Sequence, residues 1–488
     1  MFIETVRQLG YYCCIAEYYC GSLYQGRSPP RLVSRSLAAS ERGSLPDSKK
    51  GAGPEVDGIS NSADWRLQRP AEHFISGDNV TSIESSAWLG RLGPAAWRDG
   101  DGPTVLDLCA GCGGFTLGFK SAGYRVVLAA DLDPLAVATY KRNFPYVPVL
   151  RPSDRPLARR PRNGALPAQK SKRPSESASE TSDVPLGDLT QMTGEQLLDA
   201  AGIGVGEVDV VVAGLPCQGY SYIGQRRSDD PRNSLYRHFV RLIGELQPRV
   251  FLFENVPGMA TFGGGQVFND CIDTLKDLGY SVESRILDAA AFGIPQQRTR
   301  LFVFGVRPGS ATEIANFDLG TAKPVTVSEA IEDLPVDLGA VPFSGPFELQ
   351  YECAPVSQFA RLMRGSSLVV RNCAPTLHGD ELLSRLTRLA AGATDQKTGH
   401  RRLNGNAPAW TIRAGNHTRT ACRPIHPTAD RVISIREAAR LCAFPDEFLL
   451  PDTRAVAHML LGNSVPPVLS YHLASAIAQY VFGRPGPG

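Results

Sequence analysis

Short apolar runs alternate with amphipathic stretches over most of this chain, from about residue 103 onward. The pattern predicts strands at residues 104–108, 125–130, 208–213, 249–253, 281–287 and 300–306. Near-continuous Val, Leu and Phe runs separated by helical segments are typical of a parallel sheet that helices cover on both faces. We therefore predict an α/β fold with a mostly parallel sheet, in which one late strand can run antiparallel.

The periodic pattern weakens from residue 307 to about 400, where Pro, Gly and Ser are common and no strand–helix unit repeats. A helical period returns at residues 434–443, and a final helix is predicted from about residue 466 to residue 480. This divides the chain into a main domain at 101–306, a small irregular domain at 307–400, and a C-terminal part at 401–482 that completes the main domain.

Two stretches lack any sustained period of 2 or 3.6 residues. Residues 1–100 mix Ser, Gly, Pro and charged residues, and we expect this N-terminal extension to be disordered. Residues 151–185 form a second irregular stretch, an insertion rich in Arg and Lys. This insertion is either a solvated loop or an arm that contacts nucleic-acid phosphates.

The composition excludes several classes of protein. The formal net charge is +2, from 51 basic and 49 acidic residues, which excludes a uniformly basic DNA-coating protein. The hydrophobic fraction of 42% is enough for a large core and excludes disorder along the whole chain. No apolar run approaches the roughly 18–20 residues that a membrane-spanning helix needs. We expect a soluble, cytoplasmic protein.

The eleven cysteines are scattered along the chain and odd in number, so we predict reduced thiols and no disulfide scaffold. Cys109 and Cys112 form a Cys-x-x-Cys pair, but no second pair or pair of histidines follows at the spacing of a zinc site. We therefore predict no metal.

The first candidate for chemistry is the strand-to-helix turn at residues 107–114, DLCAGCGG. Glycines at such a turn let a ligand approach the backbone and the free N–H groups of the following helix. Asp131 follows the loop, where a carboxylate can bind the hydroxyls of a ribose. The third glycine of a dinucleotide-binding motif is missing, so a nucleoside without pyrophosphate fits better. A simple tight turn is the alternative reading.

Three more groups of polar residues follow predicted strands. Cys217 lies within GLPCQ, directly after an apolar strand, where a thiol is either a reactive nucleophile or a small buried hydrophobe. Glu254 ends the next strand, as a proton donor or a helix cap. Arg298 and Arg300 share one strand face by the period of two, facing a ligand or forming surface ion pairs. In an open α/β sheet, ligands bind at the carboxyl ends of the strands.

Together these motifs resemble the DNA (cytosine-5) methyltransferase family, bacterial single-chain type. The similarity covers residues 103–308 and 400–482. Its motifs are, in order, DL-x-AG-x-GG at 107–114, PCQ-x-x-S at 216–221, ENV at 254–256, Q-x-R-x-R at 296–300, REAARL-x-x-FPD at 436–446 and GNSV-P at 462–466. The resemblance implies a Rossmann-like S-adenosylmethionine-dependent methyltransferase sheet, with residues 307–400 as an inserted, mostly irregular target-recognition domain.

The resemblance also implies catalytic roles. Cys217 would attack C6 of a cytosine, since covalent addition at C6 makes C5 nucleophilic. Glu254 would hydrogen-bond N3 and the exocyclic amine of the base, and Arg298 would stabilise negative charge on the O2 side. Arg300, two residues further on, is included in this catalytic group. Asn255 would order the strand ends around the reacting groups.

For the cofactor, the resemblance implies S-adenosyl-L-methionine. Asp131 would hold its ribose, Asp188 its adenine amino group, and Asn463 and Ser464 its methionine end. Cys109 occupies a position that is aromatic in many family members. The complete predicted cofactor set is Asp107, Cys109, Gly111, Gly113, Gly114, Asp131, Asp188, Leu189, Pro216, Asn463 and Ser464.

The predicted partner is double-stranded DNA, from which the target cytosine is flipped out. We expect a monomer of a restriction–modification system, with a cognate restriction endonuclease that acts separately, or an orphan methylase. Two alternatives stay open at this point: an RNA cytosine-5 methyltransferase and a catalytically inactive DNA-binding protein. The predicted DNA contacts are Gln218, Ser221, Arg226, Arg232 and Gln296.

Overall fold

The computed structural model describes residues 101–150, 187–216, 235–309, 317–336, 348–351, 353–417 and 423–484. The predicted N-terminal extension and the basic insertion at 151–185 lie outside these residues. No helix in the described part of the chain is long and apolar enough to cross a membrane.

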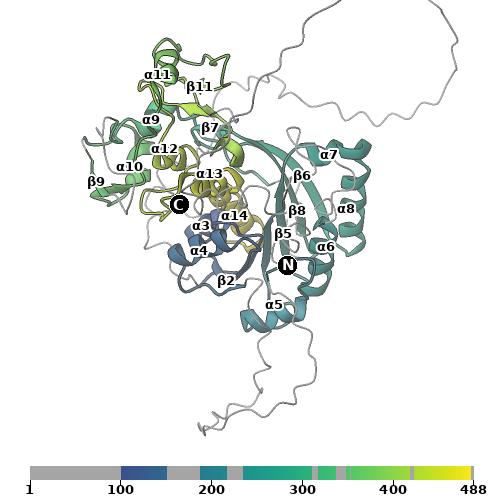
Figure 1. Ribbon diagram of the computed structural model, residues 1–488. Coiled ribbons are helices and arrows are strands. Elements are labelled where there is room, and N and C mark those ends of the chain that lie inside the picture. Colours follow the sequence, from purple (N-terminus) through teal and green to yellow (C-terminus); the bar gives the residue numbers. More distant parts are fainter. Residues whose placement is uncertain are drawn as a thin grey trace, which may run out of the picture. The chain divides into compact units, whose positions relative to one another are not determined.

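A seven-stranded sheet forms the centre of the fold, in the order β3-β2-β1-β4-β5-β8-β6 (Figure 1). All pairs from β3 to β5 are parallel, and β8 runs antiparallel to both of its neighbours. The predicted α/β fold is therefore confirmed, including one antiparallel late strand. The strands are β1 (Thr104–Leu108), β2 (Arg125–Ala130), β3 (Val149–Leu150), β4 (Val210–Gly214), β5 (Val250–Asn255), β6 (Ser281–Asp288) and β8 (Thr299–Val306).

Alternate residues of the central strands enter two separate apolar cores. In β4, Val210 and Val212 belong to one core, whereas Val211 and Ala213 belong to the other. This follows from the two-residue period of a strand, because both faces of the sheet are covered. One face is covered by α3 (Gly114–Ser121), α4 (Pro134–Asn143), α13 (Arg454–Asn463) and α14 (Pro467–Phe482), and the other by α5 (Gly194–Ala201), α6 (Leu235–Leu246), α7 (Gly258–Thr261) and α8 (Gln266–Asp277).

The last helix, α14, lies beside α3, which follows the glycine-rich turn (Figure 1). The hydroxyl of Ser470 donates to the carbonyl of Phe115 over 3.0 Å. A side chain at Gly118 would collide with Ser470, so the absence of a side chain at this position lets the two helices approach closely. The C-terminal part thus completes the main core, although 355 positions separate Ser470 from Phe115 in the sequence.

The region between β8 and α12 (Ile435–Leu441) consists of short elements. They are α9 (Val327–Ile331), β9 (Glu348–Gln350), α10 (Gln358–Arg364), β10 (Val369–Arg371), α11 (Asp380–Leu386), β11 (Arg401–Arg402), β12 (Ala409–Trp410) and β13 (Pro424–Ile425). A small apolar cluster joins Leu386, Ile425 and Val432. Leu386 lies before residue 400, and Ile425 and Val432 lie after it, so the cluster joins residues from both sides of the expected domain boundary, which stays a prediction.

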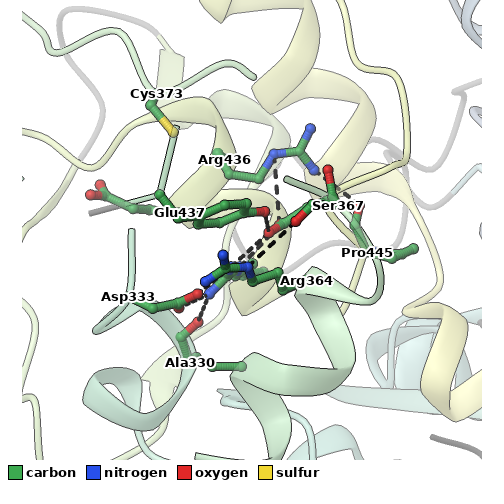
Figure 2. A network of polar contacts seen from close by, with 12 residues as sticks. Ala330, Asp333, Arg364, Ser367, Cys373, Arg436, Glu437 and Pro445 are labelled. Carbon is green, nitrogen blue, oxygen red and sulfur yellow. Dashed lines mark hydrogen bonds and ion pairs between the residues drawn. The ribbon is translucent and has the colours of Figure 1, made fainter. Parts of the chain in front are cut away.

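Buried arginines connect this region to α12 (Figure 2). Arg440 is fully buried and pairs with Asp333 and Asp446. Although burial opposes ionisation, the charge and hydrogen bonds of Arg440 hold the pKa of Asp446 below its usual value. Arg436 donates to the carbonyls of Pro445 and Phe448, each over 3.0 Å. These contacts satisfy backbone carbonyls that short elements leave without partners.

Candidate active site

The carboxyl ends of β4 and β5 bring two of the predicted motifs together. Gly214 of β4 pairs in register with Glu254 of β5. Glu254 is 7% exposed, and its Oε1 lies 2.8 Å from Nε of Arg300 on the neighbouring strand β8. Glu254 and Arg300 therefore form an ion pair at the edge of the sheet where β4 and β5 end.

The two arginines of the Q-x-R-x-R motif have different environments. Arg298 is 2% exposed and donates to the carbonyls of Gly462 (3.0 Å) and Ser464 (2.8 Å), with a longer contact to that of Ile412. The guanidinium of Arg298 is thus directed to backbone carbonyls, and its expected contact with the base stays a prediction. The two arginines were expected to lie on one strand face. They do not, because Arg298 lies between two strands, β7 (Gln296–Gln297) and β8.

Gln296 was expected to contact DNA, and in the structure its side chain lies inside the protein. It is fully buried, its amide nitrogen donates to the carbonyl of Leu441, and its Oε1 accepts from the N–H of Ile412. Both ends of the amide are therefore used inside the protein. Asn255 is also buried, and its Oδ1 accepts from the N–H of Val256 at the end of β5. This contact agrees with an ordering role, which stays a prediction.

The glycine-rich turn is tied to the end of β2 through Asp131. Its Oδ2 accepts from the N–H of Gly111 over 2.7 Å, and its Oδ1 from the N–H of Asp133. Burial raises the pKa of Asp131 to about 6 against these hydrogen bonds. Gly111 has a positive φ of 58°, and open space lies where a side chain would be. The turn thus presents an open backbone next to a carboxylate.

At Gly113 and Gly114 the absence of a side chain allows close packing and leaves no open space. A side chain at Gly113 would collide with Phe144, and one at Gly114 with the carbonyl of Val465. The thiol of Cys112 lies 2.9 Å from the hydroxyl of Ser464. The predicted segment at 462–466 therefore packs on the glycine-rich turn, as expected from its motif, while the side chain of Asn463 is exposed.

Asp107 lies at 0% exposure in β1, below the turn. Its Oδ2 accepts from the N–H and the hydroxyl of Thr116, whereas its Oδ1 has no hydrogen-bond partner among the described residues. Burial raises the pKa of Asp107 to about 7. A buried carboxylate oxygen without a partner is costly, which indicates a ligand at this position or a bound proton.

Cys109 adopts a positive φ of 57°, which is rare for a residue with a side chain. Burial raises the pKa of its thiol, and the charges of Asp131, Asp107 and Asp188 raise it further. Three carboxylates that were predicted to bind the cofactor therefore all raise the pKa of the Cys109 thiol. The side chain of Asp188 accepts from the N–H and the hydroxyl of Thr190.

The other predicted site residues lie near these strand ends or outside the described chain. Leu189 is buried in the second core, and Pro216 lies two residues after the end of β4. The residues that fall outside the described part are Cys217, Gln218, Ser221, Arg226 and Arg232. Among the residues that the structure does describe, no three His, Cys, Asp or Glu side chains are placed to hold a metal ion.

The family model for C-5 cytosine-specific DNA methylases matches residues 104–152 and 177–479. The chain belongs to this family. The match includes both sides of the site, from the glycine-rich turn to the segment that packs on it. The resemblance expected from the motifs is thereby confirmed, and the chain is an enzyme of a DNA-methylating family.

Two similar proteins are Type II methyltransferases. M.XorII of Xanthomonas oryzae pv. oryzae is 32% identical over 406 residues, which cover 78% of this chain and 86% of the relative. M.AgeI of Thalassovita gelatinovora is 29% identical over 460 residues, which cover 76% of this chain and 98% of the relative. A crystal structure assigned to a prophage-encoded DNA modification methyltransferase of E. coli has a TM-score of 0.63 and 26% identity, covering 78% of this chain and all of that one. The predicted Rossmann-like methyltransferase fold is confirmed.

Proposed function

We propose that this methylase transfers the methyl group of S-adenosyl-L-methionine to C5 of a flipped-out cytosine in a short duplex DNA site. The observation that carries this proposal is the Glu254–Arg300 ion pair, in register with Gly214, three residues before Cys217. A carboxylate and a guanidinium at one strand end can together bind one edge of a cytosine, where the exocyclic amine donates hydrogen bonds and O2 accepts them.

The thiolate of Cys217 supplies the electron pair that forms a bond to C6 of the base. The ring electrons then move onto C5, which makes this carbon nucleophilic toward a methyl donor, and the electron pair of the broken methyl–sulfur bond would stay on the sulfur of the donor. When the C5 proton leaves, the electron pair of that bond restores the ring double bond and expels the thiolate from C6. The thiolate is thus regenerated, and the net change is replacement of the C5 proton by a methyl group.

Glu254 and Arg300 act on the opposite edge of the ring. Glu254 hydrogen-bonds N3 and the exocyclic amine, and protonation at N3 offsets the negative charge that thiolate addition brings. Arg300 takes the role that the sequence had assigned to Arg298, stabilising charge at O2. Its 2.8 Å contact with Glu254 fixes both side chains before a base arrives. Arg298 is then a positioning residue, which holds the segment at 462–464 through its carbonyls.

The cofactor site is proposed at the glycine-rich turn. The partnerless Oδ1 of Asp107 and the open face of Gly111 fit a cationic ligand that carries a nucleoside. Asp131 is positioned to accept from ribose hydroxyls, and Asp188 from an adenine amino group. When bound, S-adenosyl-L-methionine supplies an electrophilic methyl group.

A DNA substrate is supported by the family and by the names of its Type II relatives. A base inside a duplex must be flipped out before Cys217 can reach it, at a cost of a few kcal/mol. We propose a monomer in a restriction–modification system, whose endonuclease acts separately on the same site.

The decisive experiment is bisulfite sequencing of a plasmid and of cellular RNA from a methylation-free host that expresses the chain. We expect protected cytosines in one short DNA context, and none with Cys217→Ser. Glu254→Gln should lower the methylation rate about 10²- to 10⁴-fold, the usual contribution of general acid–base catalysis.

Glu283→Gln is the matched control. Glu283 lies on β6, 3.6 Å from Arg285, and its loss should leave the rate unchanged. A folded protein that leaves the plasmid unmarked would overturn the proposal. Protected cytosines in RNA with an unmarked plasmid would support the RNA methyltransferase instead.

A further inference from the structure

An arginine stacked on a tryptophan lies next to the catalytic strand and has no role in the proposed mechanism. The guanidinium carbon of Arg401 is 4.0 Å from the centre of the Trp410 ring. Arg401 is exposed, and no carboxylate among the described residues forms an ion pair with it. A guanidinium over an indole is an energetically favourable cation–π contact, and stacking restricts its plane.

The backbone around this pair is firmly held. The N–H of Arg401 donates to the carbonyl of Arg423, and β11 pairs with β13. The next residue, Arg402, points into the protein and donates to the carbonyls of Leu386, Leu389, His426 and Ala429. Arg402 therefore anchors the strand, while Arg401 presents its side chain on the surface.

The tryptophan is joined to the segment that carries the catalytic arginine. Trp410 of β12 pairs in register with Gln297 of β7, three residues before Arg300. The hydroxyl of Thr411 donates to the carbonyl of Gln297 over 2.8 Å. Backbone pairing thus sets the position of Trp410 relative to the segment that carries Arg300, and the stacking contact places Arg401 beside it, as a group that reads DNA next to a reacting base requires.

The donors of Arg401 are used selectively. Its Nε donates to the carbonyl of Gly392 over 3.0 Å, which together with the indole fixes the orientation of the guanidinium. The edge formed by its two Nη groups makes no hydrogen bond to the described residues. Two parallel N–H donors in a fixed plane match O6 and N7 of guanine, the most common specific contact of arginine in the major groove.

We propose that Arg401, held against Trp410, reads a guanine at one position of the recognised DNA sequence. This inference rests on the proposed function, because the substrate must be duplex DNA. A contact to a phosphate is the main alternative, since it needs the positive charge but not the fixed plane.

The test uses the full chain and a duplex library with random bases around a single cytosine. Methylation at each sequence is read by bisulfite sequencing for the native protein, Arg401→Ala and Arg401→Lys. We expect the native preference for guanine at one position to fall roughly 5- to 150-fold in both variants, which is the discrimination of one bidentate contact. Preferences at the other positions should be unchanged.

Trp410 offers a second test. Trp410→Phe keeps an aromatic face and should retain the guanine preference, whereas Trp410→Leu should weaken it at the same position. The matched control is Arg364→Ala, because Arg364 stacks on Tyr351 at 3.8 Å, and its Nη1 donates to the carbonyl of Cys353. That variant should keep the complete native preference.

A uniform loss of rate over all sequences in Arg401→Ala, with recovery in Arg401→Lys, would identify a phosphate contact and overturn the proposal. An unchanged preference would overturn it as well. If the native protein methylates no duplex, the proposed function fails. Sequencing the library DNA that native and Arg401→Ala protein retain then still tests the reading of guanine, because binding needs no turnover.

Discussion

In the central sheet the buried side chains are mostly apolar, whereas the region from α9 to α12 combines apolar contacts with several buried arginines. Strands β4 and β5 bury Val, Ala, Leu and Phe on both faces and satisfy their backbone groups through five- and six-residue ladders. The strands of the second region have only two or three residues. Arg402, Arg436 and Arg440 donate to its carbonyls and carboxylates instead.

This difference shows how a small irregular region acquires a defined structure. Apolar contact is not directional, so a long regular sheet also needs its hydrogen-bond ladders to set the register. A short strand offers few such bonds. Arginine has five donors in a rigid plane and can join several chain segments at once. Because a buried ion is expensive to leave unpaired, such contacts fix one arrangement rather than adding much stability.

The largest expected effect tests this dependence on arginine directly. Arg440→Met leaves the buried carboxylates of Asp333 and Asp446 without their main partner. We expect a loss of about 3–5 kcal/mol in the free energy of unfolding, measured in urea. Arg371→Met removes the exposed pair with Glu348 and should cost less than about 1 kcal/mol. Equal losses in both variants would contradict the comparison.

Asp107 is one of the few polar side chains buried inside the sheet. Its pKa is about 7 in the folded chain and 3.8 for the unperturbed group, so the folded state holds a proton that the unfolded state releases. Stability therefore falls as pH rises from about 4 to 7. Asp107→Asn has no carboxyl group at this position, so its stability should not fall in this way. The difference in unfolding free energy between Asp107→Asn and the native chain should therefore shift in favour of the variant by roughly 2–3 kcal/mol between pH 5 and pH 8. A gap that does not change with pH would show that Asp107 is not the group that titrates.

Arg298, between β7 and β8, joins the sheet to the segment at 462–464 at the end of α13. Arg298→Met removes its donors to the carbonyls of Gly462 and Ser464 and should cost about 2 kcal/mol of unfolding free energy. Because this segment packs on the glycine-rich turn, we expect KM for S-adenosyl-L-methionine to rise more than kcat falls. Arg298→Lys should bring KM for S-adenosyl-L-methionine part of the way back to its native value. A fall in kcat alone would instead favour direct contact of Arg298 with the base.

The smallest effect should be the same in both regions, because it is local. Thr193 caps α5 beside the sheet, and Thr326 caps α9 in the second region, each by accepting from an N–H three residues on. Thr→Ala at either position should cost about 1 kcal/mol in thermal or urea unfolding. A much larger loss at Thr326 would show that short helices of the second region depend on their caps more than the sheet does.

The sequence by itself determined the elements whose formation is local. The two-residue period and the apolar runs predicted the strands that became β1, β2, β4 and β5. The order of strand and glycine-rich turn predicted the loop at 107–114, whereas its hydrogen bond to Asp131 appeared only in the structure. These features depend on how apolar and polar side chains alternate between residues that are close in the sequence. The pattern along the chain contains this alternation directly.

Only the tertiary structure decided which distant groups meet. A period of two placed Arg298 and Arg300 on one face, yet the chain passes from β7 to β8 between them, so that one is buried and the other reaches Glu254. Cys112 and Ser464 are 352 residues apart but lie in contact, and the small cluster at Ile425 continues past the boundary expected at residue 400. Such pairs arise from the packing of whole elements, which a local pattern of apolar and polar residues does not contain.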